Sequence, residues 1–296
     1  MQCGIRARRE REDRWDGVKG IGGSTAEVIR EAVAGGIPAR LAALRDESTT
    51  STSAMRTALR GDLHSHSEWT DGTTPIEVMA DTAAWLGHEY LALTDHSPHL
   101  RVANGLSPER LREQLAVVAG YGGGVRLLSG IEVDILDDGA LDQLDDLLER
   151  LDVVVASVHS KLKMPADEMT ARMLAAVRNP HTDVLGHCTG RLVEGSRGTR
   201  PQSQFDARAV FTACAAHGTA VEINSRPERR DPPTNLLELA RDLGCLFSID
   251  SDAHAPGQLD FLWYGAERAE AAGIDPDRIV NTWPKERLLE WANPEG

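Results

Sequence analysis

Two histidines separated by one residue, followed by an acidic turn, form the most distinctive chemical pattern in this 296-residue chain. The stretch Asp62-Leu-His-Ser-His-Ser-Glu-Trp-Thr-Asp-Gly72 places His64 and His66 at the expected end of a strand. Alternate residues of a strand point to the same face, so both imidazoles can reach one point. Asp71 adds a carboxylate five residues later. Imidazole and carboxylate groups together are typical metal ligands, so the stretch predicts half of a metal site.

The same residue types recur where later apolar runs end, in Thr94-Asp-His96, Gly130-Ile-Glu132, Ser157-Val-His159, Gly186-His187 and Asp250-Ser-Asp-Ala-His254. Six of the ten histidines fall at such ends, which chance placement does not explain. The other four are expected to be surface or packing residues: His88, His99, His181 and His217. The pattern therefore predicts nine metal ligands, which are His64, His66, Asp71, His96, Glu132, His159, His187, Asp252 and His254.

The elements that would position these residues alternate between strand and helix from Arg60 onward. After a first strand near Leu63, runs with β character lie at 91–94, 125–133, 153–158, 184–186, 220–223 and 245–249. Helical patterns lie at 75–86, 108–119, 141–151, 166–177, 206–216 and 236–243. About seven βα units imply parallel strands that close into a barrel, whose C-terminal strand ends form the active face. No Gly-x-Gly-x-x-Gly follows the first strand, which disfavours a dinucleotide-binding open sheet.

Composition narrows the possible partners and the compartment. The formal net charge of −14 argues against a broad nucleic-acid-binding surface, although residues 1–60 carry 11 Lys and Arg against 8 Asp and Glu. No apolar run approaches the roughly 20 residues of a membrane helix, and the first ten residues lack the apolar core of a signal peptide. The four cysteines show no paired spacing, so we expect free thiols and a cytoplasmic protein.

The first 59 residues divide into three expected segments. Residues 1–16 are charged and aperiodic, which predicts a disordered basic tail, and residues 48–59 are expected to form a linker. Between them, residues 17–47 show a Gly-x-Gly turn before a Ser/Thr-capped helix, and a second helix at 38–46. This resembles a helix-hairpin-helix element, in which Gly20 and Gly22 would hold a DNA phosphate. A plain capped helix remains the alternative.

The strand-end motifs resemble the polymerase-and-histidinol-phosphatase (PHP) superfamily over about residues 60–296. The match is nearest to the PHP domain of bacterial family X DNA polymerases, through the stretches Gly186-His-Cys-Thr-Gly-Arg191, Val221-Glu-Ile-Asn224 and Leu259-Asp-Phe-Leu-Trp-Tyr-Gly265. The resemblance implies a distorted (β/α)7 TIM-like barrel, here preceded by a short helical segment. The residues before 60 are too few for a polymerase domain, so we do not expect a polymerase.

The resemblance also implies three divalent metal ions, of manganese, zinc or iron. One metal would take His64, His66, Glu132 and Asp252. A second would share Glu132 and add His159 and His187, and a third would take Asp71, His96 and His254. Clustered cations lower the pKa of a bound water, so a metal-bridging hydroxide would hydrolyse a phosphate ester.

Catalysis is expected to rest on Glu132, Asp252 and Arg191. Arg191 follows His187 by four residues and is the candidate phosphate clamp, because a guanidinium grips two phosphate oxygens. Lys161 and Asn224 are further candidates for binding the substrate.

Three functions remain open from the sequence. The first is an enzyme for DNA 3′ ends, of the 3′-5′ exonuclease, 3′-phosphatase or abasic-site endonuclease type, with a role in DNA repair. The second is a small-molecule phosphatase, such as one for histidinol phosphate. The third is a non-catalytic scaffold, which the filled set of nine ligand positions disfavours. The sequence gives no indication of the oligomeric state.

Overall fold

The computed structural model describes residues 22–33, 39, 53–195 and 198–293, and it divides into the units Met1–Thr52 and Ser53–Gly296. In the first unit, α2 (Gly23–Val33) begins directly after Gly22. The apolar spacing of this helix buries Ala26. Several parts of the N-terminal prediction lie outside the described residues. These are the expected tail at 1–16, Gly20 and nearly all of the expected second helix.

Seven parallel strands form the centre of the second unit, in the order β1 to β7. They are β1 (Gly61–Asp62), β2 (Tyr90–Leu93), β3 (Arg126–Asp134), β4 (Val153–Ser157), β5 (Val184–Leu185), β6 (Ala220–Asn224) and β7 (Phe247–Asp250). A parallel bridge between Ser65 and Ala253 brings the two ends of the sheet together. The expected seven-stranded TIM-like barrel is confirmed, because each short apolar run is buried and pairs with the next.

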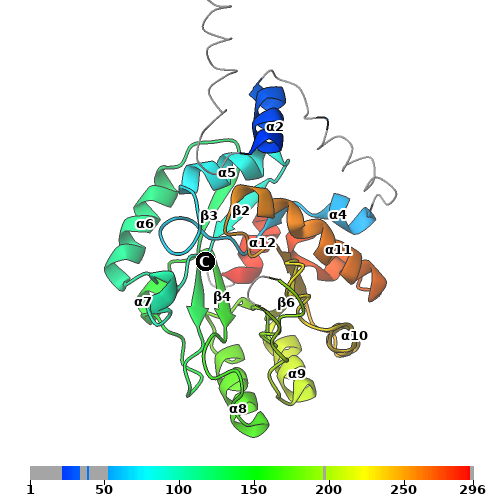
Figure 1. The fold of residues 1–296 in the computed structure, drawn as a ribbon. Helices are drawn as coiled ribbons and strands as arrows, with labels where there is room; N and C mark the ends of the chain where they lie inside the picture. Colours follow the sequence, from blue (N-terminus) through cyan, green and yellow to red (C-terminus); the bar gives the residue numbers. More distant parts are fainter. Residues whose placement is uncertain (1–21, 34–38, 40–52, 196–197, 294–296) are drawn as a thin grey trace, which may run out of the picture. The chain divides into compact units, whose positions relative to one another are not determined.

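Helices surround the strands of this unit (Figure 1). The α-helices are α5 (Ile76–Trp85), α6 (Pro108–Gly120), α7 (Asp145–Leu148), α8 (Ala166–Val177), α9 (Ala207–His217), α10 (Thr234–Asp242), α11 (Leu262–Ala271) and α12 (Lys285–Ala292). The short 3-10 helices are η1 (Arg101–Ala103), η2 (Pro256–Phe261), η3 (Pro276–Arg278) and η4 (Val280–Thr282). The helix expected at 141–151 was too long, because Leu141 instead pairs with Ile135 in an antiparallel bridge.

The barrel unit begins earlier than the sequence suggested. Residues 54–58, expected to belong to a linker, form the short helix α4 (Ala54–Ala58). The hydroxyl of Ser53 and the backbone N–H of Met55 both donate to a carboxylate oxygen of Glu270 on α11, at 2.9 and 2.8 Å. Met55 is also buried in the main apolar core. These contacts make residues 53–59 part of the barrel unit.

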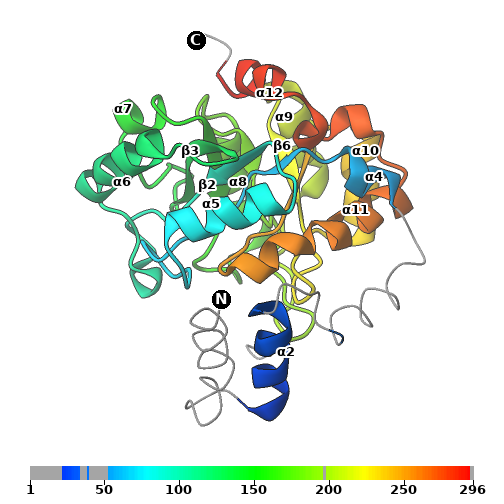
Figure 2. The same ribbon diagram turned by 90° about the horizontal axis from the view of Figure 1, so that it is seen from above.

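The N-terminal end of the barrel is filled by apolar side chains from the last part of the chain. Val280, Trp283 and Leu288 pack with Tyr90 and Val153, near the start of their strands. Figure 2 shows α12 at the upper edge of the barrel unit. This packing closes the end opposite the strand C-termini, which leaves the C-terminal face as the open face of the barrel.

Asn281 connects β7 to the segment that closes the barrel. Its buried side-chain amide donates to the Ile249 carbonyl at 3.0 Å and to the Asp250 carboxylate at 2.9 Å, and it accepts from the Ile249 N–H at 2.7 Å. We expect Asn281→Ala to lower the free energy of unfolding by about 2 kcal/mol, because buried polar groups lose their partners. Urea denaturation measures this change. Asn235→Ala, on the exposed surface of α10, is the matched control, and an equal loss there would contradict the assignment.

Two expectations from composition concern cysteines and membranes. Cys188, Cys214 and Cys245 are buried free thiols, and burial raises the pKa of each. Cys3 lies outside the described residues. Among the helices that the structure describes, none is long and apolar enough to cross a membrane.

Candidate metal centre

Glu132, at the end of β3, lies at the centre of the histidine cluster. Its Oε2 atom lies 3.4 Å from His64 Nε2 and 2.8 Å from His96 Nδ1. Its Oε1 atom lies 3.2 Å from His159 Nε2 and 2.9 Å from His187 Nε2. One buried carboxylate therefore faces imidazoles from four different strand ends, which is the arrangement of a ligand shared by two metal ions.

Two further carboxylates complete the cluster. Asp252 Oδ1 lies 3.4 Å from His66 Nε2. Asp71 Oδ1 lies 3.3 Å from His96 Nε2 and 3.4 Å from His254 Nε2. Three groups of side chains could each hold a metal ion, because the ligand atoms within each group lie within 4.8 Å of one another. The groups are His66, Asp71, His96 and His254; His64, His66 and Asp252; and His96, Glu132 and His159. With His187 against Glu132, the structure brings all nine side chains of the sequence prediction into one site.

The barrel explains why residues so distant in sequence meet. The two histidines of the first motif flank Ser65, whose hydroxyl donates to the Ala92 carbonyl in the neighbouring strand at 2.8 Å. That bond turns Ser65 away and leaves both imidazoles on the other face. Asp252 has a φ of 51°, in the left-handed region, which turns the chain so that its carboxylate and His254 both face the cluster.

The chemistry of the donors fits divalent transition metals. Both carboxylate oxygens of Glu132 and the Nε2 atoms of His64, His66 and His187 are buried without a hydrogen-bond partner among the described residues. Leaving buried polar atoms unpaired costs free energy, and metal coordination would satisfy all of them at once. Mixed imidazole and carboxylate ligands suit zinc, manganese or iron.

Two buried carboxylates that the sequence analysis did not single out orient the histidines. Glu222 Oε1 lies 2.5 Å from His64 Nδ1, and Asp134 Oδ1 lies 2.7 Å from His159 Nδ1. Each would fix its imidazole with Nε2 directed at the cluster. Glu222 also accepts from the His187 N–H at 2.5 Å. An acidic residue inside the apolar run of β6 was a signal in the sequence that could have found Glu222.

Electrostatics in the metal-free site are dominated by the central carboxylate. Burial alone would raise the pKa of Glu132, but His159, His64 and His96 hold it well below its usual range. Burial lowers the pKa of His66, and His254 and His96 lower it further. Burial alone would lower the pKa of His96 too, but Glu132 and Asp71 raise it to about 10.

This raised pKa predicts how metal binding depends on pH. At pH 7 the metal-free protein holds a proton on His96, and a metal must displace that proton to use the nitrogen. We therefore expect apparent metal affinity to rise with pH between 6 and about 8, with protons released on binding. Calorimetric titration in buffers of different ionisation enthalpy measures the number released. A metal affinity independent of pH over this range, with no proton release, would contradict the prediction.

Arg191, the arginine expected to clamp a phosphate, lies against the loop after β6. Arg191 donates through Nε to the Arg229 carbonyl at 3.1 Å and through Nη2 to the Arg230 carbonyl, so it supports the loop after β6. Arg191 does not line the cavity over the metal cluster, whereas Arg200, Arg226 and Arg229 do. Sequence spacing could not reveal this.

The other two substrate-binding candidates also lie outside that cavity. Lys161 is exposed and forms an ion pair with Asp137. Asn224 is buried, and its side-chain amide donates to Asp252 at 3.1 Å and to Glu222 at 3.2 Å. Asn224 therefore positions a candidate metal ligand, and its contact with a substrate stays a prediction.

Comparison with known proteins agrees with this geometry. The PHP domain family matches residues 62–226. DNA polymerase/3′-5′ exonuclease PolX of Bacillus subtilis is 37% identical over 226 residues, which are 75% of this chain and 39% of that protein. This chain thus spans well under half the length of that relative. A protein named a probable phosphatase, from Syntrophotalea carbinolica, is 30% identical, over 74% of this chain and 90% of that one.

A solved structure supports the fold. Histidinol phosphate phosphatase of Lactococcus lactis, crystallised with zinc, L-histidinol and phosphate, superposes with a TM-score of 0.52 at 18% identity, over 73% of this chain and 94% of that one. A parallel barrel with this ligand cluster at its C-terminal strand ends defines a metal-dependent hydrolase of the barrel class. The chain belongs to the PHP domain family.

Proposed function

We propose that this PHP-family metal-dependent phosphoester hydrolase acts on the 3′ ends of DNA, with three divalent metal ions of manganese, zinc or iron at the nine-residue cluster. The observation that carries the proposal is one cavity of about 250 Å³ that combines candidate metal ligands with three arginines. Cations beside guanidinium groups favour a phosphate, whose oxygens both kinds of group bind.

Arg226 and Arg229 are the proposed phosphate-binding residues. Arg229 is 7% exposed, and its Nε lies 3.1 Å from Asp252. Arg226 Nη1 donates to the Asp252 carbonyl at 3.0 Å and lies 3.0 Å from His254 Nδ1. Both guanidinium groups are thus held against the metal cluster before any substrate arrives. Such preorganised charge stabilises the developing charge on phosphoryl oxygens.

The proposed assignment of metals follows the three ligand sets. Glu132 would be shared, and Glu222 and Asp134 would hold the orientation of His64 and His159. Bound divalent cations would supply an activated water and neutralise the phosphoryl oxygens. The residues of the protein position those oxygens and exclude bulk water from the buried side of the cluster.

Apolar side chains also line the cavity. Leu100, Val102 and Leu162 line it, and Val102 is 93% exposed, the most exposed large apolar side chain among the described residues. The loop that carries it is well anchored, because Arg110 donates to the Asn104 carbonyl at 2.6 Å. Apolar side chains in the same cavity as a phosphate site suit an organic leaving group such as a nucleoside.

A small-molecule phosphatase is the second candidate. The relative named a probable phosphatase, of which this chain covers 90%, favours it, as does the limited cavity volume of about 250 Å³. The identity to the Bacillus subtilis exonuclease and the basic balance of residues 1–60 favour DNA. Gly22, at the start of α2, remains a proposed contact to a DNA phosphate, together with Gly20.

The test uses the full chain loaded separately with manganese, zinc or iron. The DNA substrates are 5′-labelled oligonucleotides that end in a 3′-hydroxyl or a 3′-phosphate, or that contain an internal abasic site. The small-molecule substrate is histidinol phosphate. We expect shortening or dephosphorylation of the DNA 3′ ends that a chelator abolishes. Hydrolysis of histidinol phosphate with no change in any oligonucleotide would overturn the DNA proposal and favour the second candidate.

A further inference from the structure

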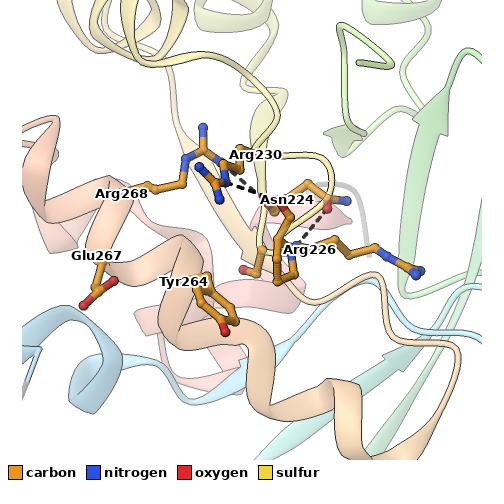
Figure 3. Close-up of a pocket in the computed structure, with 8 residues that line it drawn as sticks. Asn224, Arg226, Arg230, Tyr264, Glu267 and Arg268 are labelled. Carbon is orange, nitrogen blue, oxygen red and sulfur yellow. Dashed lines mark hydrogen bonds between the residues drawn. The ribbon is translucent and has the colours of Figure 1, made fainter. Parts of the chain in front are cut away.

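A second cavity lies beside the metal centre, on the other side of the loop that follows β6. It has a volume of about 230 Å³ and lies between this loop and α11. In Figure 3, Tyr264, Glu267 and Arg268 project from the helix, while Asn224, Arg226 and Arg230 come from the strand end and loop. None of the residues that line it belongs to the nine candidate metal ligands.

The two cavities are adjacent because Arg226 lines both. Its guanidinium reaches the metal side, where it lies 3.0 Å from His254. Figure 3 shows it directed away from Arg230 and Arg268. A chain-like substrate held at the candidate metal centre would therefore pass Arg226 to reach this cavity.

The chemistry of the lining combines positive charge with an aromatic ring. Arg230, Arg268 and one glutamate, Glu267, line the cavity, while the guanidinium of Arg226 lies on the side of the candidate metal ligands, so a small excess of positive charge remains here. Tyr264 is half-buried and rests on Trp263, with ring centroids 4.3 Å apart, so the ring is held in place. A ring beside guanidinium groups is the combination that binds a nucleotide, with the base stacked and the phosphate paired.

The arginines and the backbone of this cavity are preorganised. Arg268 donates to the carbonyls of Asn224 and Asp231, each at 3.3 Å. Arg230 has a φ of 46°, and its exposed side chain donates to the Pro227 carbonyl at 3.2 Å and forms an ion pair with the exposed Glu194 at 3.2 Å. Burial lowers the pKa of Arg268 to about 10, with a further lowering by Arg191 and Arg230 and an opposing effect of Asp231. The Arg268 guanidinium therefore stays charged at neutral pH.

One buried hydroxyl adds a hydrogen-bonding group. Ser225 lines the cavity and is 1% exposed, and its Oγ has no hydrogen-bond partner among the described residues. Gly265 allows this approach, because a Cβ there would lie 2.3 Å from Ser225 Oγ. The helix can therefore carry Tyr264 close against the loop.

From this geometry we infer a subsite for one nucleotide of a single DNA strand, next to the unit that is cut, with its base on Tyr264 and its phosphate near Arg230. The inference rests on the proposed action on DNA. It implies that the enzyme prefers an oligonucleotide over a mononucleotide with the same scissile group.

The test compares kcat/KM for a single-stranded oligonucleotide ending in 3′-phosphate with kcat/KM for thymidine 3′-monophosphate, which is too short to fill both cavities. Base stacking on an aromatic side chain is worth about 1–3 kcal/mol, so we expect Tyr264→Ala and Tyr264→Leu each to lower this ratio about tenfold. Tyr264→Leu keeps the bulk of the side chain. Arg230→Glu is expected to lower the ratio further, through the KM of the oligonucleotide.

Arg112→Glu makes the same change of charge on α6, where Arg112 lies 3.8 Å from Asp146, and it is the matched control. One outcome is that the wild-type protein cuts DNA ends while the Tyr264 and Arg230 variants keep the wild-type ratio of the two kcat/KM values. That result would show that the subsite is wrong, and the proposed function would stand. If the wild-type protein hydrolyses p-nitrophenyl phosphate yet leaves every oligonucleotide intact, both proposals are overturned.

Discussion

Glu132→Gln is expected to lower kcat/KM for any phosphate ester by about 10³-fold and to reduce the metal content of the purified protein. The carboxylate faces four imidazoles from different strand ends, so its charge would serve more than one metal ion. A neutral amide keeps the shape but loses the charge and one ligand atom. A loss of several kcal/mol in metal-assisted stabilisation corresponds to this factor.

Elemental analysis and steady-state kinetics on the same preparation measure both effects. Glu238→Gln, an exposed position on α10, is the matched control for the same chemical change. We expect Glu132→Gln to remain folded, because the amide matches the volume of the carboxylate. A variant with full metal content and more than a tenth of the wild-type rate would show that Glu132 is not a shared ligand.

The second large effect, a loss of metal affinity, is expected from Glu222→Gln. Glu222 is not one of the nine candidate metal ligands. Glu222 orients His64 through Nδ1 at 2.5 Å and accepts from the His187 N–H at 2.5 Å. Loss of such a supporting carboxylate typically costs about 10–100-fold in metal affinity or activity. We therefore expect metal affinity to fall by that factor, and excess metal to restore much of the rate.

Rescue by excess metal separates this role from a loss of folding. Glu149→Gln, exposed just after α7, is the control with the same substitution. A Glu222→Gln protein with unchanged metal affinity would show that the contact to His64 is not needed for binding. A protein that stays inactive at saturating metal would instead assign Glu222 a direct part in the reaction.

The residues that gather at the candidate metal site could be predicted from the sequence because a parallel barrel gives each strand end the same location. A His or acidic residue directly after an apolar run must lie on the C-terminal face. His96, His159 and His187 each follow a strand in this way. The seven strands were equally readable, since buried parallel strands are short continuous apolar runs.

Side-chain direction beyond the strand ends depended on tertiary structure. Arg191 follows His187 closely in sequence, yet its guanidinium donates to carbonyls of the loop after β6, and Arg226 and Arg229 line the cavity beside the candidate metal ligands. Loop conformation is set by many weak contacts, including left-handed residues such as Arg230, and no periodic pattern encodes it.

The sequence by itself determined the family, the barrel and the residues gathered at its open face, because each depends on a strong local signal that the parallel topology repeats. Only the tertiary structure decided which arginines accompany the metal cluster, how Glu222 and Asp134 hold the histidines, and that a second cavity borders the first. These features arise between segments distant in sequence, whose approach is fixed by packing of the whole barrel.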